Sequence, residues 1–97
     1  MLIEKELKTK VAKDFWKAVL NLKTESECEK FFRDVATLSE LMAMCERWQV
    51  AKMVDKGISY REINQQTGVS TATITRVAHW LNYGTGGYKL MLEKMKN

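Results

Sequence analysis

The sequence predicts an all-α protein of six helices that includes a helix-turn-helix. Apolar residues recur every three or four positions along almost the whole chain, and the alternation of polar and apolar residues typical of a β-strand is absent. Helix-capping residues punctuate these periodic stretches, and the sequence contains no proline. At 97 residues, we expect one domain over residues 1–97.

The N-terminal half of the chain predicts three helices. The first, near residues 2–22, has a stripe made of Ile3, Leu7, Val11, Phe15, Val19 and Leu22. A capping-box pair, Thr24 and Glu27, starts the second, whose stripe is Cys28, Phe31, Phe32 and Val35. The same pair type recurs at Thr37 and Glu40 and starts a third helix with the stripe Leu38, Leu41, Met42, Cys45 and Trp48. This third helix runs to about Lys56 and stops at Gly57.

The C-terminal half predicts three further helices. Ser59 and Glu62 form another capping box ahead of a short helix over about 60–67, which ends at Gly68. Ser70 caps a fifth helix that runs to about Asn82. A hinge over Gly84–Gly87 precedes the last helix, whose stripe is Tyr88, Met91, Leu92 and Met95.

Residues 58–81 have the pattern of a helix-turn-helix. Its turn needs a residue that tolerates positive φ, which Gly68 supplies. A small core would hold the two helices at their angle, and the residues with the right spacing are Ile63, Val69, Ile74 and Val77. Asn64 departs from the pattern because a small residue is usual at the helix crossing, so the packing is looser there or the amide finds a partner.

Charge is distributed unevenly along the chain. Up to Glu62 there are twelve Lys and Arg against eleven Asp and Glu, whereas residues 63–97 contain four Lys and Arg and one Glu. No carboxylate occurs between Glu62 and Glu93, which would let a polyanion approach this part of the surface. The alternative is a polar composition that arose by chance.

The second helix of the motif has a face suited to contacting DNA. Small or hydroxyl-bearing side chains and two potential cations lie opposite its apolar side, and an ordinary solvated face is the alternative. We expect DNA contacts from this helix and its cap, at Ser70, Thr71, Ala72, Thr73, Thr75, Arg76 and His79.

The motif resembles the Trp repressor superfamily, and the whole chain is most similar to its YerC/YecD branch of Trp-repressor-related proteins. The resemblance is carried by the stretch 57–63, by Gly68 and by the run Ala72-Thr73-Ile74-Thr75-Arg76. It implies an intertwined homodimer in which helices of residues 2–56 and 88–97 interlock. The two helix-turn-helix units would then face successive major grooves about 34 Å apart.

The resemblance also implies a possible effector pocket. In the Trp repressor, tryptophan lies between two arginines that match Arg47 and Arg76 here. The repressor continues with Gly-Ser-Asn-Ser, whereas this chain has Val77-Ala78-His79-Trp80. Val77 narrows the space for a ligand indole and Trp80 can place its own indole nearby, so we expect no tryptophan corepressor. Arg76 would then contact phosphate or base, or brace the fold.

Other classes of function have little support. No apolar run is long enough to span a membrane, and the first residues lack a signal peptide. Cys28 and Cys45 are expected to be reduced core thiols, which favours the cytoplasm. With a single histidine there is no metal-ligand spacing, and no catalytic motif is present, so we expect neither metal, cofactor nor enzyme activity.

These observations predict a homodimeric, sequence-specific regulator of transcription, more specifically a repressor, that binds double-stranded DNA at the nucleoid. Two alternatives remain open: a replication-origin or other DNA-binding module on the same fold, and a helical interaction module without DNA binding.

Overall fold

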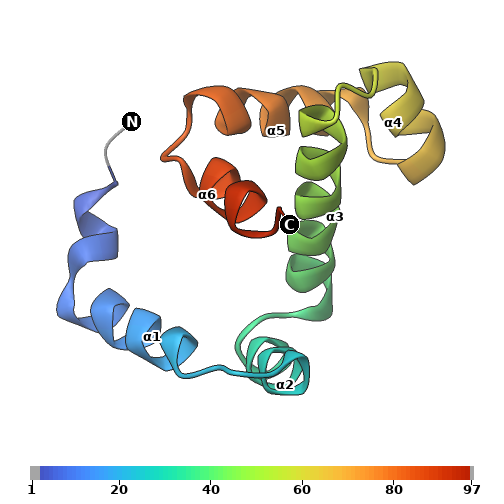
Figure 1. Ribbon diagram of the computed structural model, residues 1–97. Helices are drawn as coiled ribbons and strands as arrows, with labels where there is room; N and C mark the ends of the chain where they lie inside the picture. Colours follow the sequence, from blue (N-terminus) through green and yellow to red (C-terminus); the bar gives the residue numbers. More distant parts are fainter. Residues whose placement is uncertain (1–2, 97) are drawn as a thin grey trace. The chain divides into compact units, whose positions relative to one another are not determined.

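The computed structural model describes residues 3–96, and all of its regular secondary structure is helical (Figure 1). The six α-helices that the sequence predicts are present, and a short 3-10 helix precedes them. The elements are η1 (Lys5–Lys8), α1 (Lys10–Leu20), α2 (Glu25–Val35), α3 (Leu38–Asp55), α4 (Tyr60–Thr67), α5 (Thr71–Tyr83) and α6 (Gly87–Lys94). None of the helices in the described part of the chain has the length and apolarity that a membrane span requires.

The described chain falls into two compact units that meet inside α3, between Leu41 and Met42. The first unit contains η1, α1, α2 and the first turn of α3. The second contains the rest of α3 and α4 to α6, and it includes the whole predicted helix-turn-helix.

The predicted first helix is interrupted, so its expected range of 2–22 is wrong. Thr9 is extended, with φ −70° and ψ 164°, and its hydroxyl accepts a hydrogen bond from the Ala12 amide at 3.2 Å. This side chain caps α1 and leaves η1 as a separate turn. The Trp16 indole donates a hydrogen bond to the Leu7 carbonyl at 3.3 Å and ties the two pieces together.

Three phenylalanines form the centre of the first unit. The Phe15 ring lies 5.8 Å from Phe31 and 6.5 Å from Phe32, centre to centre, which joins α1 to α2. Among residues 3–41, however, no residue is fully buried. The expectation that Cys28 and Cys45 are core thiols is wrong for the single chain: both are free and exposed, because neither helix face is covered within its own compact unit.

A capping box has two hydrogen bonds, one to each side chain of the pair. Both form at α3, and at α2 the second is shifted by one residue. At α3, the Thr37 amide donates to Glu40 at 2.9 Å and the Glu40 amide donates to the Thr37 hydroxyl at 3.1 Å. These hydrogen bonds, the one from the Thr37 backbone first, lower the pKa of Glu40 below its ordinary 4.5. At α2, Thr24 caps in the same way, but Glu27 accepts from the Lys23 amide, one residue earlier.

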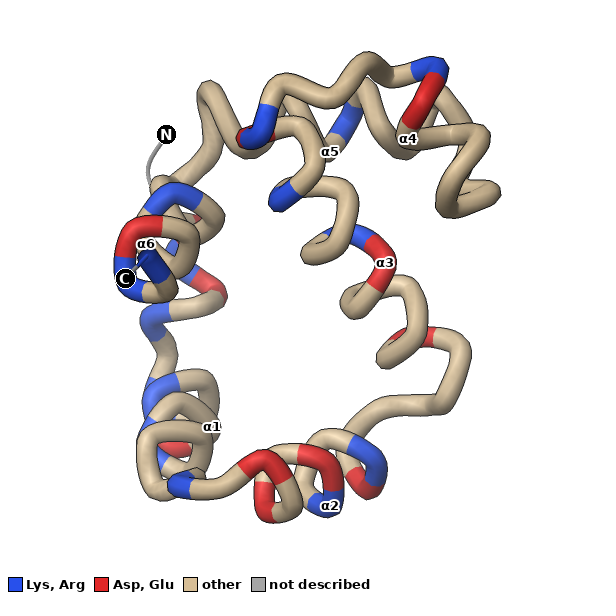
Figure 2. Tube along the Cα trace, turned by 45° about the vertical axis from the view of Figure 1, so that its right-hand side comes forward, with Lys and Arg blue, Asp and Glu red and all other residues tan. Residues whose placement is uncertain are grey.

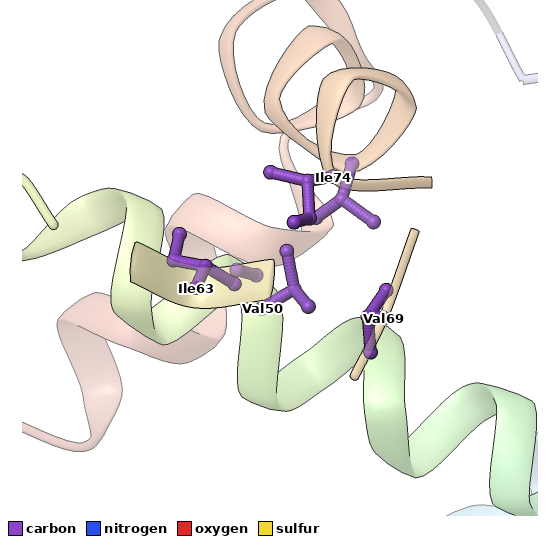
Figure 3. Packing of buried hydrophobic residues seen from close by; sticks show 6 residues of the cluster. Val50, Ile63, Val69 and Ile74 are labelled. Atoms are coloured by element: carbon purple, nitrogen blue, oxygen red, sulfur yellow. The ribbon is translucent and has the colours of Figure 1, made fainter. Parts of the chain in front are cut away.

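The core of the second unit lies where α3, α4 and α5 meet (Figure 3). Val50 and Ala51 come from α3, and the other buried members of the cluster are the four residues that the sequence assigns to the helix-turn-helix core, Ile63, Val69, Ile74 and Val77. That assignment is confirmed. The motif is therefore built on the second half of α3 and has no separate core of its own.

The last helix is attached through a glycine-containing link and an aromatic pair. Gly86 has φ +95° at the start of α6, which a glycine adopts without strain. Tyr88 packs against the core cluster, and its ring stacks on Trp48 of α3 at 6.4 Å with 15° between the planes. α6 thus covers the same core that holds the motif.

Candidate nucleic-acid interface

The turn between α4 and α5 is held by side chains of α4. Gly68 ends α4 in the left-handed conformation, with φ +76°, and donates its amide to the Asn64 carbonyl at 2.9 Å. The Thr67 hydroxyl donates to the Ile63 carbonyl at 2.7 Å and accepts from the Val69 amide at 3.1 Å. The polar groups of this tight turn are therefore paired, which keeps the turn in one conformation.

Asn64 has a definite role at the helix crossing. Its side-chain amide donates to the Val69 carbonyl at 2.8 Å, across the turn. Of the two outcomes that the sequence left open at this position, the structure shows the second: the amide has found a partner. The bond replaces the close helix contact that a small residue would allow.

The third capping box forms in one direction only. Ser59 caps α4 by accepting from the Glu62 amide at 3.1 Å, but the Glu62 carboxylate accepts from Gln66 at 3.2 Å. Ser70 caps α5 by accepting from the Thr73 amide at 3.2 Å. The two short helices thus begin at the residues that the sequence indicates.

One side of α5 is buried and the opposite side is exposed. The buried side consists of Ile74, Val77, Ala78 and Leu81. The residues expected on the opposite side are all exposed, namely Thr71, Ala72, Thr75, Arg76 and His79. At 100° per residue, Ala72, Arg76, His79 and Tyr83 form a single row along the middle of that face. This row is the most accessible line for a flat or grooved partner.

Two of the predicted contact residues are engaged with each other. The Ser70 hydroxyl donates to the Thr73 hydroxyl at 3.1 Å, and Thr73 is half-buried. Their hydroxyls hold the first turn of α5 in place. Among the predicted residues, the ones whose side chains are free to meet DNA are Thr71, Ala72, Thr75, Arg76 and His79.

The charge of α4 and α5 leaves this side of the unit open to an anion. Figure 2 shows one basic and one acidic band on α4, which are Arg61 and Glu62, and a basic band on α5, which is Arg76. α5 has no carboxylate. Within residues 3–96 the one ion pair joins Lys96 to Glu93 at 3.5 Å, so Arg76 forms none there.

The sequence-based list omitted two residues that the structure brings forward. Arg61 is exposed in the first turn of α4, the helix that crosses the DNA backbone in helix-turn-helix proteins. Tyr83 is 69% exposed at the end of the α5 row. The signals were available: a cation next to the cap of the first helix, and the spacing of 72, 76, 79 and 83.

The four residues of the possible effector pocket lie in different surroundings. Arg47 and Arg76 are exposed, on α3 and α5. Val77 is 2% exposed and belongs to the core cluster, while Trp80 is 41% exposed with its ring against His79 at 5.2 Å. The expectation that tryptophan does not bind as a corepressor stays a prediction.

Comparison with known proteins decides the family. The family model described as Trp repressor protein matches residues 10–96, most of the chain. The chain belongs to the Trp repressor family. Proteins of this family bind DNA and are not enzymes, so the chain is not an enzyme. The family also confirms the resemblance inferred from the motif.

Relatives and solved structures support the same assignment. The YerC protein of Bacillus subtilis (strain 168), which is uncharacterized, is 40% identical over 96 residues, covering 99% of this chain and 91% of YerC. A crystal structure of a TrpR-like protein from Eubacterium eligens has a TM-score of 0.91 and 40% identity, and it covers 95% of each chain. A candidate Trp repressor from Staphylococcus aureus has a TM-score of 0.91 and 36% identity, with 98% of this chain and 95% of that chain covered. The all-α, six-helix, Trp-repressor-like fold is thereby confirmed.

Proposed function

We propose that this protein is a homodimeric, sequence-specific regulator of transcription, more specifically a repressor, that binds double-stranded DNA in the cytoplasm through α4 and α5. Membership of the Trp repressor family indicates a DNA-binding regulator. The proposal adds the residues that make the contact, the dimer and the repressing role.

The observation that carries the proposal is the exposed face of α5. It is free of acids, it presents Arg76 without an ion-pair partner in residues 3–96, and Ala72 leaves room for close approach. A helix on the surface of a protein without such a role more often carries Glu and Lys at exposed positions. In the major groove, Thr71 and Thr75 can bond to bases or phosphates, Ala72 can meet a thymine methyl, and Arg76 can pair with guanine.

The scaffold suits this role because it holds α5 rigidly. The buried side of α5 packs on α3 and α4, and the paired turn at Gly68 sets the angle between the two helices. A recognition helix must keep its orientation to place several side chains on base edges at once. Arg61, on α4, is the further cation that we assign to the phosphate backbone.

The dimer is proposed on the helices of the first unit. Val11 is 83% exposed and Leu20 is 80% exposed on α1, and none of residues 3–41 is buried. Helices of this length are marginal in water unless an apolar face is covered. A second copy of the chain, interlocked as the family resemblance implies, would supply that cover.

The experiment is a DNA-binding titration with matched variants. Duplexes bound by the wild-type protein are selected from a random pool, and affinity is measured by fluorescence anisotropy at several salt concentrations. Binding should weaken steeply with salt, with a slope of about 0.9 per phosphate neutralised. Arg76→Ala should cost roughly 1–3 kcal/mol of binding free energy if Arg76 contacts a base.

Lys30→Ala is the matched control, since Lys30 is an exposed cation on α2, outside the helix-turn-helix unit. It should leave the affinity within about twofold of wild type, as expected for a surface charge that takes no part in the contact. The proposal would be overturned by binding that is indifferent to salt, or by affinity that is unchanged in both Thr75→Ala and Arg76→Ala. Absence of binding to any duplex would favour a helical interaction module.

A further inference from the structure

The C-terminal half of α5 carries an exposed aromatic cluster that the proposed base contacts do not use. The His79 ring lies 5.2 Å from Trp80 and 5.3 Å from Tyr83, centre to centre. Tyr83 is 69% exposed and Trp80 is 41% exposed, whereas the next residue on the same helix, Leu81, is buried. Rings in this position are held in place by one another and offer polar edges to the solvent.

His79 and Tyr83 continue the row that begins at Ala72 and Arg76. With a rise of about 1.5 Å per residue, Tyr83 lies about 16 Å along the helix axis from Ala72. The major groove is about 12 Å wide. For a helix that crosses the groove with its first turns on base edges, the last turn therefore lies beyond the groove floor, level with a sugar-phosphate strand.

The chemistry of the two residues fits a phosphate. A phenol hydroxyl and an imidazole N–H both donate hydrogen bonds, and phosphate oxygens accept them strongly. Neither side chain donates or accepts a hydrogen bond within residues 3–96, so both are available. α5 has no carboxylate that would repel the strand or compete for the donors.

We propose that His79 and Tyr83 form a phosphate anchor at the C-terminal end of α5, with the Tyr83 hydroxyl donating to a phosphate of the operator backbone. The proposal rests on the proposed function, and it assigns a separate task to each half of the helix. The first turns contact bases and determine sequence preference. The last turn contacts the backbone, which positions the helix without any sequence information.

The test compares Tyr83→Phe with the wild-type protein on two duplexes. One duplex is selected by the wild-type protein from a random pool, and the other is a scrambled duplex of equal length and composition. Tyr83→Phe keeps the ring and its contact with His79 and removes only the hydroxyl. Affinity should fall about three- to tenfold on both duplexes, because a backbone contact is lost equally from each.

The salt dependence gives a second readout. A neutral hydroxyl displaces no counterion, so Tyr83→Phe should leave the slope of affinity against salt unchanged. Arg76→Ala should instead reduce the preference for the selected duplex over the scrambled one. Tyr88→Phe is the matched control: it removes a hydroxyl from a ring stacked on Trp48, and it should leave both affinities unchanged.

A thermodynamic cycle locates the contact. Single phosphates of the selected duplex are replaced by neutral methylphosphonates, and binding of wild type and Tyr83→Phe is measured on each. At one phosphate position the difference between the two proteins should disappear, since the hydroxyl has then lost its charged partner.

Three results would overturn the anchor while leaving the proposed function intact. The first is wild-type affinity in Tyr83→Phe on both duplexes. The second is a loss of affinity confined to the selected duplex, which would make Tyr83 a base contact. A third result, a change in the dimer equilibrium of Tyr83→Phe by sedimentation, would assign the residue to the partner copy and also overturn it. If the wild-type protein binds no duplex at all, the proposed function fails and the anchor fails with it.

Discussion

Asn64 occupies a crossing of two helices where helix-turn-helix proteins ordinarily have a small residue. Here its amide donates to the Val69 carbonyl at 2.8 Å, in a half-buried position. The bond joins α4 to the start of α5 and satisfies a carbonyl that the turn would otherwise leave without a partner among residues 3–96. A polar residue thus does by hydrogen bonding what a small one does by close packing.

Asn64→Ala should therefore destabilise the protein. Losing the bond and leaving the Val69 carbonyl unpaired should lower the free energy of unfolding by about 1 kcal/mol, measured by urea denaturation. Gln65→Ala is the control, because Gln65 is an exposed neighbour on the same helix, and it should change stability by less than about 0.5 kcal/mol. An equal or greater stability of Asn64→Ala would contradict the role given to this bond.

At the scale of elements, the link between α5 and α6 depends on Gly84. Its backbone has an ordinary negative φ of −82°, so conformational freedom is not what requires glycine here. Glycine is required here because a Cβ on residue 84 would clash with the Trp80 backbone carbonyl. The same carbonyl accepts a hydrogen bond from the Gly84 amide at 2.9 Å. The end of α5 and the start of the link are therefore packed backbone against backbone.

Gly84→Ala should destabilise the protein by about 1–3 kcal/mol, because the backbone carbonyl cannot move aside without disturbing the last turn of α5. Gly87→Ala makes the same chemical change three residues later, where a Cβ would meet open space at the first residue of α6. It should leave stability unchanged or raise it by up to about 1 kcal/mol, since alanine favours helix. Thermal unfolding of the pair measures the contrast, and equal melting temperatures would show that the steric argument is wrong.

At the scale of the whole molecule, the proposed dimer determines stability. Helices α1 and α2 have no fully buried residue, although the polar stripe of α1, Lys10, Lys13, Asp14 and Lys17, leaves the rest of that helix apolar. An apolar face that only a second subunit covers makes folding and assembly one equilibrium. The melting temperature should then rise with protein concentration.

Val11→Glu should weaken the dimer, because Val11 is exposed on the apolar side of α1 that it shares with Phe15 and Ala18, and the melting temperature should fall. Lys13→Glu adds the same acid to the polar stripe and should leave assembly unchanged. Sedimentation equilibrium at micromolar concentration measures both. A folded wild-type monomer under these conditions, with a melting temperature that does not depend on concentration, would be incompatible with the proposed dimer.

Much of the fold follows from local sequence signals. Four helices have starts or ends that match Thr24, Gly57, Ser59, Gly68 and Ser70, because capping side chains and left-handed glycines act on their own few residues of backbone. The core of the motif and the exposed side of α5 follow from the 3.6-residue period. Such features need no knowledge of what lies elsewhere in the chain.

Other features were decided by tertiary structure, because they depend on residues distant in sequence or on atoms that the pattern does not specify. The apolar periodicity of the first predicted helix continues through Thr9, yet the helix is interrupted there. The Thr9 hydroxyl accepts a hydrogen bond from the Ala12 amide, and the Trp16 indole donates one to the Leu7 carbonyl. The packing of the motif core against Val50 of α3 is visible only in the tertiary structure. Cys28 and Cys45 lie on apolar faces that a single chain leaves uncovered, because periodicity identifies an apolar face and not the surface that covers it.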